Sequence, residues 1–270
     1  MPEERIARVA VTRVSGASTT RGDDVLVVEE PLEIRAGWRS DGEQREKAIS
    51  VTMRTPGDDY DLAAGFLFTE GLIRSADDIE SVRHWGSPNI VRVALSEGAK
   101  IDSAKLDRHF YTTSSCGVCG KTSIDALRVA ANKLPRGKPP AGDLIHRLPV
   151  ALRDGQSGFL ATGGLHGAAL FDEEGTMRRL REDVGRHNAV DKVIGSLFLE
   201  HATPLSHSIL MVSSRASFEL VQKAIVAGIP LLAAVGAPSS LAVDLAREFG
   251  LTLLGFVRDG RFNVYAGEVG

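Results

Sequence analysis

The stretch that decides the fold is SILMVSSRASFELVQKAIVAGIPLLAAVGAPSSLAVDLAREFGLTLLGFV, residues 208–257. Three short apolar runs, at 208–212, 231–235 and 251–257, alternate here with two segments whose apolar residues recur at helical spacing. Each helical segment ends at a glycine, the residue that most often closes a helix. Strands that alternate with helices predict a largely parallel sheet covered on both faces, with right-handed crossovers.

The segment before this stretch predicts two further elements. Residues 168–180 contain two short apolar runs around the turn signal Asp172-Glu173-Glu174-Gly175, which predicts a hairpin. The apolar residues from Val190 to Phe198 follow the spacing of one helical face.

The first half of the chain looks more mixed. We expect strands at 25–34, 47–54 and 90–95 and one helix that contains Leu62–Leu67. The first 20 residues are polar and irregular, so we expect a mobile arm, with a short strand at most.

A breaker-rich stretch, LPRGKPPAG at 134–142, is the best candidate for a linker. We therefore expect a smaller N-terminal α+β part at 1–133 and an α/β domain at 143–270. The predicted fold class is α/β, with a mixed or parallel sheet and helices on both faces.

Composition excludes several classes of protein. Hydrophobic residues make up 43% of the 270 residues and charged residues 25%, which excludes disordered and fibrous chains. The net charge of -3 and the 6% aromatic content give no sign of nucleic-acid or membrane binding. The acidic start and the absence of an apolar run near ~20 residues predict a cytoplasmic protein.

The only two cysteines, Cys116 and Cys119, form a C-x-x-C motif. This spacing indicates metal or redox chemistry in a cytosolic chain. Structural zinc is disfavoured because the sequence has no second pair and no H-x₃₋₅-H, and deaminase-type zinc because it has no H-x-E. A thioredoxin-like disulfide exchanger would place the motif in an early βαβ unit, whereas this motif comes late in the chain behind a Ser/Thr run, which disfavours that fold. The remaining alternative is that the two cysteines are buried structural thiols.

The residues after the motif favour a reactive thiolate. Thr122 and Asp125 have the spacing of a capping box and predict that a helix begins there. The positive end of that helix and the ammonium of Lys121 would lower the pKa of a nearby thiol.

At these residues the sequence resembles the FdhD family, the formate dehydrogenase accessory sulfurtransferases. The cysteine motif Ser114–Lys121 resembles the family's signature, and long ungapped stretches elsewhere match as well. These stretches are 29–32, 54–59, 63–67, 181–192, 237–240 and 262–265. The sequence departs from the expected family pattern at two positions. Gly167 stands where the pattern has Ala, and Ser214 stands where the pattern has Gly, so that the loop beside Arg215 is affected.

The resemblance implies a sulfurtransferase with a cysteine persulfide intermediate on Cys116. It takes sulfur from a cysteine desulfurase and passes it to molybdenum bis(molybdopterin guanine dinucleotide) before that cofactor enters formate dehydrogenase. The resemblance also implies a homodimer and a cytidine deaminase-like second half without zinc. Two other functions stay open: a chaperone that only binds the cofactor, and a thiol-disulfide oxidoreductase.

Ligands of parallel sheets bind beyond the carboxyl ends of the strands. Three predicted loops lie there, and their candidate cofactor-binding residues are Arg215, Ser239, Gly255, Phe256, Val257, Arg258, Asp259, Gly260 and Arg261. Arginines can bind phosphate with two hydrogen bonds, although each loop alone also fits ordinary turn chemistry. The resemblance implies that the Phe-x-Arg stretch binds the guanine nucleotide part, so GDP should mimic the cofactor.

Weaker signals lie at two other places. The glycine-rich Thr162–Gly167 lacks a full phosphate-loop pattern and precedes a strand. In Glu182–His187, Asp183 is a candidate helix cap, and Arg186 and His187 are candidates to line the cofactor cavity.

Two expectations concern the cysteine motif itself. We expect no bound metal, and much less than stoichiometric zinc in the purified protein. We also expect the 111–121 loop to be mobile without cofactor and to become ordered on binding.

Overall fold

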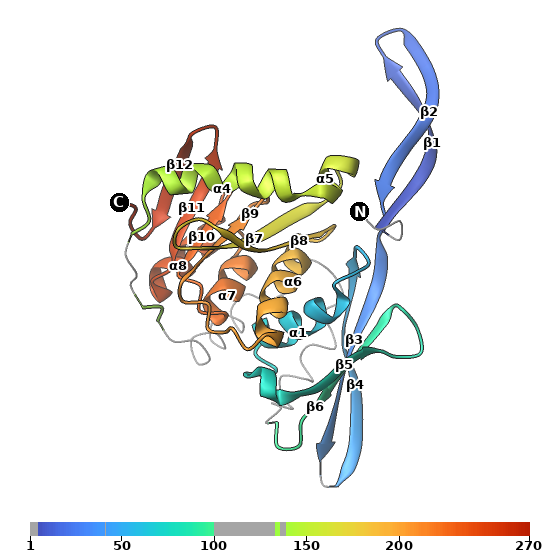
Figure 1. Ribbon diagram of the computed structural model, residues 1–270, viewed down its shortest axis with the longest axis vertical. Helices are drawn as coiled ribbons and strands as arrows, with labels where there is room; N and C mark the ends of the chain where they lie inside the picture. The colour runs from blue at the N-terminus through green and yellow to red at the C-terminus, as the bar shows by residue number, and fades with distance from the viewer. Residues whose placement is uncertain (1–4, 41, 100–132, 136–138) are drawn as a thin grey trace.

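The computed structural model describes residues 5–40, 42–99, 133–135 and 139–270 (Figure 1). A six-stranded sheet forms the centre of the C-terminal half. In sheet order its strands are β12 (Arg261–Ala266), β11 (Thr252–Arg258), β10 (Leu231–Ala234), β9 (Ser208–Val212), β7 (His166–Asp172) and β8 (Met177–Asp183).

Within this six-stranded sheet, parallel pairing is confined to the three strands of residues 208–257. β9 and β11 both pair in parallel with β10, whereas β7, β8 and β12 add antiparallel neighbours at the two edges. The sheet is therefore mixed, and the predicted hairpin at 168–180 is formed by β7 and β8.

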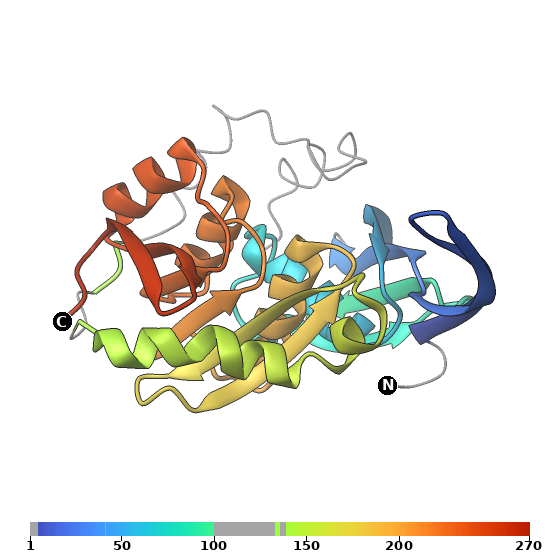
Figure 2. The ribbon, with the colours of Figure 1, turned by 90° about the horizontal axis from the view of Figure 1, so that it is seen from above.

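Helices cover both faces of this sheet, as expected (Figure 2). One face holds α6 (Arg186–Leu199), α7 (Phe218–Val226) and α8 (Ser240–Phe249). The other face holds α4 (Gly142–Gly155), whose buried leucines pack against β7, β9 and β11. The short helix α5 (Ser157–Thr162) follows α4 directly.

Within residues 5–99, the described part of the N-terminal half includes a second sheet of four strands and the helix α1. The sheet order is β4 (Glu43–Arg54), β3 (Glu30–Ser40), β6 (Ile90–Leu95) and β5 (Ile79–His84). The helix α1 (Asp59–Thr69) lies between this sheet and α6, and a short 3₁₀ turn, η2 (Ala76–Asp78), precedes β5.

The expectation of an irregular arm is wrong for residues 6–27, which form a long antiparallel hairpin. Its strands are β1 (Ile6–Ser15) and β2 (Ser18–Val27), and it extends away from the body of the protein (Figure 1). The predicted single strand at 25–34 is divided after Val27, because β2 pairs with β1 whereas β3 enters the four-stranded sheet.

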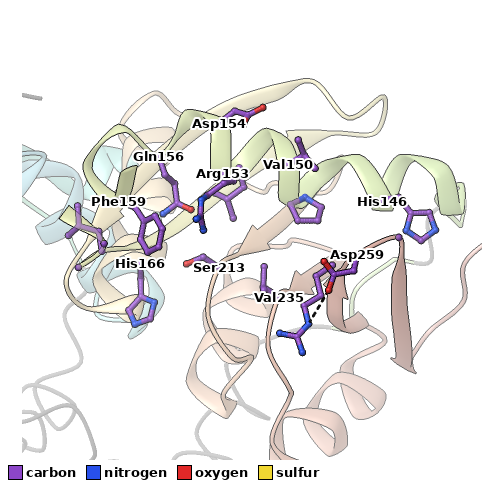
Figure 3. Close-up of a pocket in the computed structure, with 17 residues that line it drawn as sticks. His146, Val150, Arg153, Asp154, Gln156, Phe159, His166, Ser213, Val235 and Asp259 are labelled. Atoms are coloured by element: carbon purple, nitrogen blue, oxygen red, sulfur yellow. Dashed lines mark ion pairs between the residues drawn. The ribbon is translucent and has the colours of Figure 1, made fainter. Parts of the chain in front are cut away.

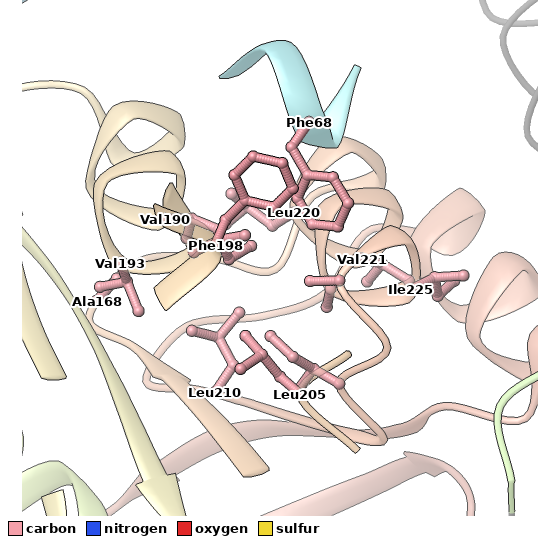
Figure 4. Close-up of a cluster of buried hydrophobic side chains, with 14 of the residues drawn as sticks. Phe68, Ala168, Val190, Val193, Phe198, Leu205, Leu210, Leu220, Val221 and Ile225 are labelled. Atoms are coloured by element: carbon pink, nitrogen blue, oxygen red, sulfur yellow. The ribbon is translucent and has the colours of Figure 1, made fainter. Parts of the chain in front are cut away.

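Contacts between α1 and α6 join the two halves. A Cβ on Gly65 would lie 2.0 Å from the Asp191 carbonyl oxygen, and one on Gly195 would lie 1.9 Å from that of Asp61. The rings of Phe68 and Phe198 stack with centroids 4.4 Å apart (Figure 4). Because one hydrophobic cluster contains residues of both halves, the linker at 134–142 does not separate two independent cores, and the predicted domain boundary stays a prediction.

Candidate ligand-binding site

The residues that follow β9 and β10 lie beside each other and beside the end of β11. The Gly236 amide donates to the Ser214 carbonyl, and the Phe256 amide donates to the Gly236 carbonyl, both at 3.1 Å. A Cβ on Gly236 would lie 2.9 Å from Cγ of Arg215, so the close approach of these loops requires glycine. Ser214 fits this arrangement, because its hydroxyl donates to the Arg215 carbonyl at 3.0 Å.

A cavity of about 760 Å³ lies beside these strand ends, within the size range of small-molecule sites. One wall comes from α4 and α5, and the other from the residues that follow β9, β10 and β11 (Figure 3). Its lining includes His146, Arg153, Gln156, Phe159, Gly163, Gly164, His166, Ser213, Val235, Arg258, Asp259 and Gly260.

The turn between β11 and β12 brings Arg258 to the cavity. Asp259 and Gly260 have φ of 53° and 68° between the paired residues Arg258 and Arg261, as in the tight turns that connect hairpin strands. The Arg258 side chain is 48% exposed, and its Nε lies 4.0 Å from a carboxylate oxygen of Asp259. Such an exposed pair is weak, so the guanidinium is available to an anionic ligand.

Phe256 has a left-handed backbone, with φ of 55°. This conformation is costly for an aromatic residue and coincides with a shift of the β11–β12 register between Gly255 and Arg258. The Arg258 guanidinium carbon lies 5.8 Å from the centroid of the Phe256 ring. The irregular backbone thus places an aromatic ring beside the arginine of the cavity.

The other predicted cofactor residues lie near the cavity loops but are not among its lining. Ser239 caps α8 by accepting from the Ala242 amide at 3.3 Å, and Val257 is fully buried in the second hydrophobic cluster. Arg215, in the loop after β9, and Arg261, the first residue of β12, are both exposed, and a Cβ on Gly255 would lie 2.8 Å from Cδ of Pro238. Only Arg258, Asp259 and Gly260 of the predicted set line the cavity, and the roles of all nine residues stay predictions.

The α4–α5 wall was missed by sequence reasoning. Pro149 lies inside α4, where it masks the helical pattern of four leucine and isoleucine residues at 144–152. The glycine-rich stretch at 162–167 was the only signal, and Gly163, Gly164 and His166 do line the cavity.

Glu182 fixes the position of α5. Its two carboxylate oxygens accept hydrogen bonds from the amides of Gly158 and Phe159, each at 2.8 Å. These amides belong to the first turn of α5 and have no partners within the helix. A nearly buried carboxylate of β8 therefore fixes the helix that forms one end of the cavity.

Asp183, the next residue, was predicted as a candidate helix cap, but it does not occupy the N-cap position of α6. Gly185 precedes the first residue of α6, and Asp183 is fully buried with Oδ2 2.7 Å from Nζ of Lys192. Lys192 also donates to the Thr55 carbonyl at 2.9 Å, and the Thr55 amide donates to Asp183 at 3.2 Å. The stretches 54–59 and 181–192, which both match the family pattern, therefore contact each other across the boundary between the two halves.

One histidine of the cavity lining, His166, has a shifted pKa. Burial lowers the pKa of His166, and the positive charges of Arg186 and His187 lower it further. His166 is therefore a neutral imidazole at pH 7, able to donate one hydrogen bond and accept another. Arg186 and His187 themselves do not line the cavity, and Nε2 of His187 lies 2.6 Å from a carboxylate oxygen of Glu219.

Cys116 and Cys119 lie outside the described residues, as does the 111–121 loop. Within the described ranges, no three His, Cys, Asp or Glu residues are placed to hold a metal ion. No helix in those ranges is long and apolar enough to cross a membrane.

The fold and the cavity define an α/β protein with a ligand-sized site at the carboxyl edge of its sheet. The fold matches the crystal structure assigned to a formate dehydrogenase accessory protein from Desulfotalea psychrophila, with a TM-score of 0.74, 24% identity and 97% of each chain covered. The chain belongs to the FdhD/NarQ family, whose model matches residues 27–269. The mixed α/β class is thus confirmed, while the cytidine deaminase-like character of the second half stays a prediction.

Curated relatives share nearly the whole length of the chain. The protein "Sulfur carrier protein FdhD" of Streptomyces avermitilis is 49% identical, with 97% of this chain and 94% of that protein covered. The protein of the same name from Mycobacterium tuberculosis is 47% identical, with 94% of each covered.

Proposed function

We propose that this protein is a sulfur carrier that supports formate dehydrogenase by passing sulfur to its molybdenum cofactor. The observation that carries the proposal is family membership over residues 27–269 together with an intact Cys116-Gly117-Val118-Cys119 motif. The names of the relatives describe sulfur carriers, and that of the structural match a formate dehydrogenase accessory protein.

Cys116 accepts the sulfur from a cysteine desulfurase. Its thiolate attacks the outer sulfur of the persulfide on the donor, the sulfur–sulfur bond of the donor breaks, and the donor cysteine leaves as a thiolate. Lys121 and the helix predicted after it favour the thiolate form of Cys116 that this step needs.

Cys119 provides the electrons for delivery. Its thiolate attacks the inner sulfur of the Cys116 persulfide, a disulfide forms between the two cysteines, and hydrosulfide leaves toward the molybdenum. Two electrons pass from the cysteine pair to the transferred sulfur, and an external dithiol reduces the disulfide before the next cycle.

The cavity beside β9–β11 binds the nucleotide part of molybdenum bis(molybdopterin guanine dinucleotide). Arg258 has an exposed guanidinium at the cavity, and the base has room between the α4–α5 wall and the strand ends. In this proposal the protein works in the cytoplasm as a homodimer, and GDP occupies the site as a fragment of the cofactor.

Trapping the persulfide tests the proposal. The protein is incubated with a cysteine desulfurase and cysteine, alkylated and analysed by peptide mass spectrometry, and formate dehydrogenase activity is measured in cells that carry each variant. Cys116→Ala should abolish both the alkylated persulfide and the activity. In the proposed sequence of steps, Cys116 is the thiolate that accepts sulfur from the donor, and Cys119 acts only on the persulfide of Cys116.

Cys119→Ala is the matched control. It should still load Cys116 but deliver poorly, which separates loading from delivery. Full formate dehydrogenase activity with Cys116→Ala would contradict sulfur transfer and favour a chaperone that only binds the cofactor.

A further inference from the structure

The β1–β2 hairpin pairs with no third strand of the described residues. Its residue pairs run from Ile6 and Val27 at the base to Ser15 and Ser18 at the tip, and they form a two-stranded sheet of their own. Most of its side chains are exposed, and the hairpin extends away from the body (Figure 1). A two-stranded hairpin alone in water is at best marginally stable, so one that projects in this way is expected to have a further partner.

The outer edge of β2 is open to another strand. An edge strand offers N–H and C=O groups to a neighbour, and natural proteins often block such edges with proline or lysine. β2 contains neither residue over its ten positions, which span roughly 33 Å. The Val25 amide donates to the exposed Asp24 carboxylate at 2.9 Å, a local contact that a pairing strand would replace.

The charges distinguish the two edges of the hairpin. β1 carries Arg8 and Arg13 and no carboxylate, so two β1 edges would bring four arginines together. β2 carries both signs, with Arg21 beside Asp23 and Asp24. The Asp24 carboxylate lies 3.8 Å from Arg13, whereas Arg21 and the Asp23 carboxylate form no ion pair within the described residues. A second copy of β2 offers the opposite charge to both of them.

A two-fold axis between two copies of β2 restricts how they pair. Side chains alternate between the faces of a sheet, so the axis passes between a residue and the same residue of the second copy. With Gly22 on the axis, Arg21 of each copy lies opposite Asp23 of the other, and Thr20 lies opposite Asp24. The adjacent registers, with Arg21 or Asp23 on the axis, oppose two arginines or two aspartates. Opposite charges in facing positions stabilise a sheet and like charges destabilise it, which favours the Gly22 register.

We propose that two copies of this chain associate through their β2 edges, with Gly22 on the two-fold axis, to form a four-stranded antiparallel sheet. The inference rests on the proposed function for the homodimer and assigns a surface to it. In this register Ser18 of one copy lies opposite Leu26 of the other, so the tip of each hairpin reaches the base of its partner. A Cβ on Gly164, which lines the cavity, would lie 3.1 Å from Cγ1 of Val27 at that base. The interface therefore extends toward the cavity of each copy.

Exchange of the two charges tests the register. Sedimentation equilibrium of the full chain gives the dissociation constant of the dimer. Asp23→Arg and Arg21→Asp should each raise it roughly 10-fold or more, because each variant replaces two attractive contacts by two repulsive ones. The double variant Arg21→Asp/Asp23→Arg restores opposite charges and should return it to within about threefold of the unaltered value. An equal mixture of the two single variants should form mixed dimers, because the arginines of one copy then face the aspartates of the other.

A disulfide tests the position of the axis. Facing residues of antiparallel strands have Cα atoms roughly 4.5–5.5 Å apart, which a disulfide can join. Gly22→Cys should therefore give a covalent dimer on mild oxidation, since the added side chain displaces only the flexible end of Arg13, whose Nη1 would lie 2.6 Å from the Cβ. Ala10→Cys is the matched control, because it is exposed on β1 and lies away from the joined edges. Peptide mass spectrometry distinguishes this disulfide from one that involves Cys116 or Cys119.

The outcomes separate this inference from the proposed function. A dimer whose dissociation constant is unchanged in Asp23→Arg, and which gives no disulfide in Gly22→Cys, overturns the inference alone, since the copies then meet through another surface. A monomeric unaltered protein overturns both the inference and the proposed homodimer. In that case a persulfide trapped on Cys116 would still support sulfur transfer, because loading is measured independently of association.

Discussion

Arg258 is the arginine that reaches the cavity from the carboxyl edge of the sheet. Its backbone lies at the tight turn 258–261, and its guanidinium is only weakly engaged by Asp259. The turn thus brings the residue to the cavity while its charge stays available to a ligand.

Removing this charge should weaken nucleotide binding. Arg258→Ala loses a charge-assisted hydrogen bond to phosphate, worth roughly 1.5–3 kcal/mol, so GDP affinity should fall on the order of tenfold or more in calorimetry. Persulfide loading at Cys116 should be unchanged, because loading needs only the donor and the thiolate.

Arg178→Ala is the matched control for this prediction. Arg178 lies in β8 with its side chain 64% exposed and does not line the cavity. GDP binding that is equal in Arg258→Ala and the unaltered protein would show that the nucleotide site has been misplaced. A parallel loss of loading would show that the two steps are coupled.

At the scale of elements, the strands and helices of 208–257 were predictable because the signals that begin and end each element lie within its own short segment of sequence. β9 and β10 are continuous apolar runs, and α8 ends at Gly250 with φ of 77°. Their loops were also predictable as neighbours, because parallel strands share a carboxyl edge. The structure confirms that the loops after β9 and β10 meet each other and contact the end of β11.

Other elements could not be predicted because their signals depend on distant partners. The β1–β2 hairpin is mostly exposed on both faces, so it shows no alternation of apolar and polar residues. The apolar residues of α4 are recognised as one face only when they are seen packed against β7, β9 and β11, and a proline inside the helix obscures their spacing. The same limits hid half of the site, since Gln156 and Phe159 meet the cavity only through tertiary packing.

The contact between α1 and α6 makes a testable prediction. Gly195→Ala would place a methyl group against the Asp61 carbonyl and force the helices apart. Overpacking of this kind costs about 1–3 kcal/mol, so the melting temperature should fall by roughly 2–10 °C in differential scanning calorimetry.

Gly142→Ala provides the comparison. Gly142 begins α4, and an added Cβ would meet only Cζ of Phe262, at 4.0 Å. This variant should melt within about 2 °C of the unaltered protein, since ordinary contact costs little. An equal effect of the two substitutions would contradict a tight helix contact.

At the scale of the whole molecule, the two halves should unfold together. One hydrophobic cluster includes Leu32 and Leu62 of the first half and Leu210 and Leu253 of the second. The buried pair of Asp183 and Lys192 also binds Thr55 across the same boundary. Separating the halves would expose the apolar residues of the cluster to water and would remove the hydrogen bonds of Thr55 to Asp183 and Lys192, and both losses destabilise the separated halves.

We therefore expect a single calorimetric transition whose van't Hoff and calorimetric enthalpies agree. Lys192→Met, which leaves Asp183 without its cation, should lower the temperature of this transition by several degrees without dividing it. Two resolved transitions in the unaltered protein would instead support independent domains on either side of 134–142.

The adjacent residues Glu182 and Asp183 constrain the number of residues in β8. Successive side chains of a strand point to opposite faces, so one carboxylate holds α5 at the cavity and the other binds Lys192 between the halves. A single inserted or deleted residue before them would exchange the two faces and break both attachments together. The spacing along this strand is thus constrained more strictly than its composition: conservative substitutions elsewhere in β8 are tolerable, but a shift of one residue is not.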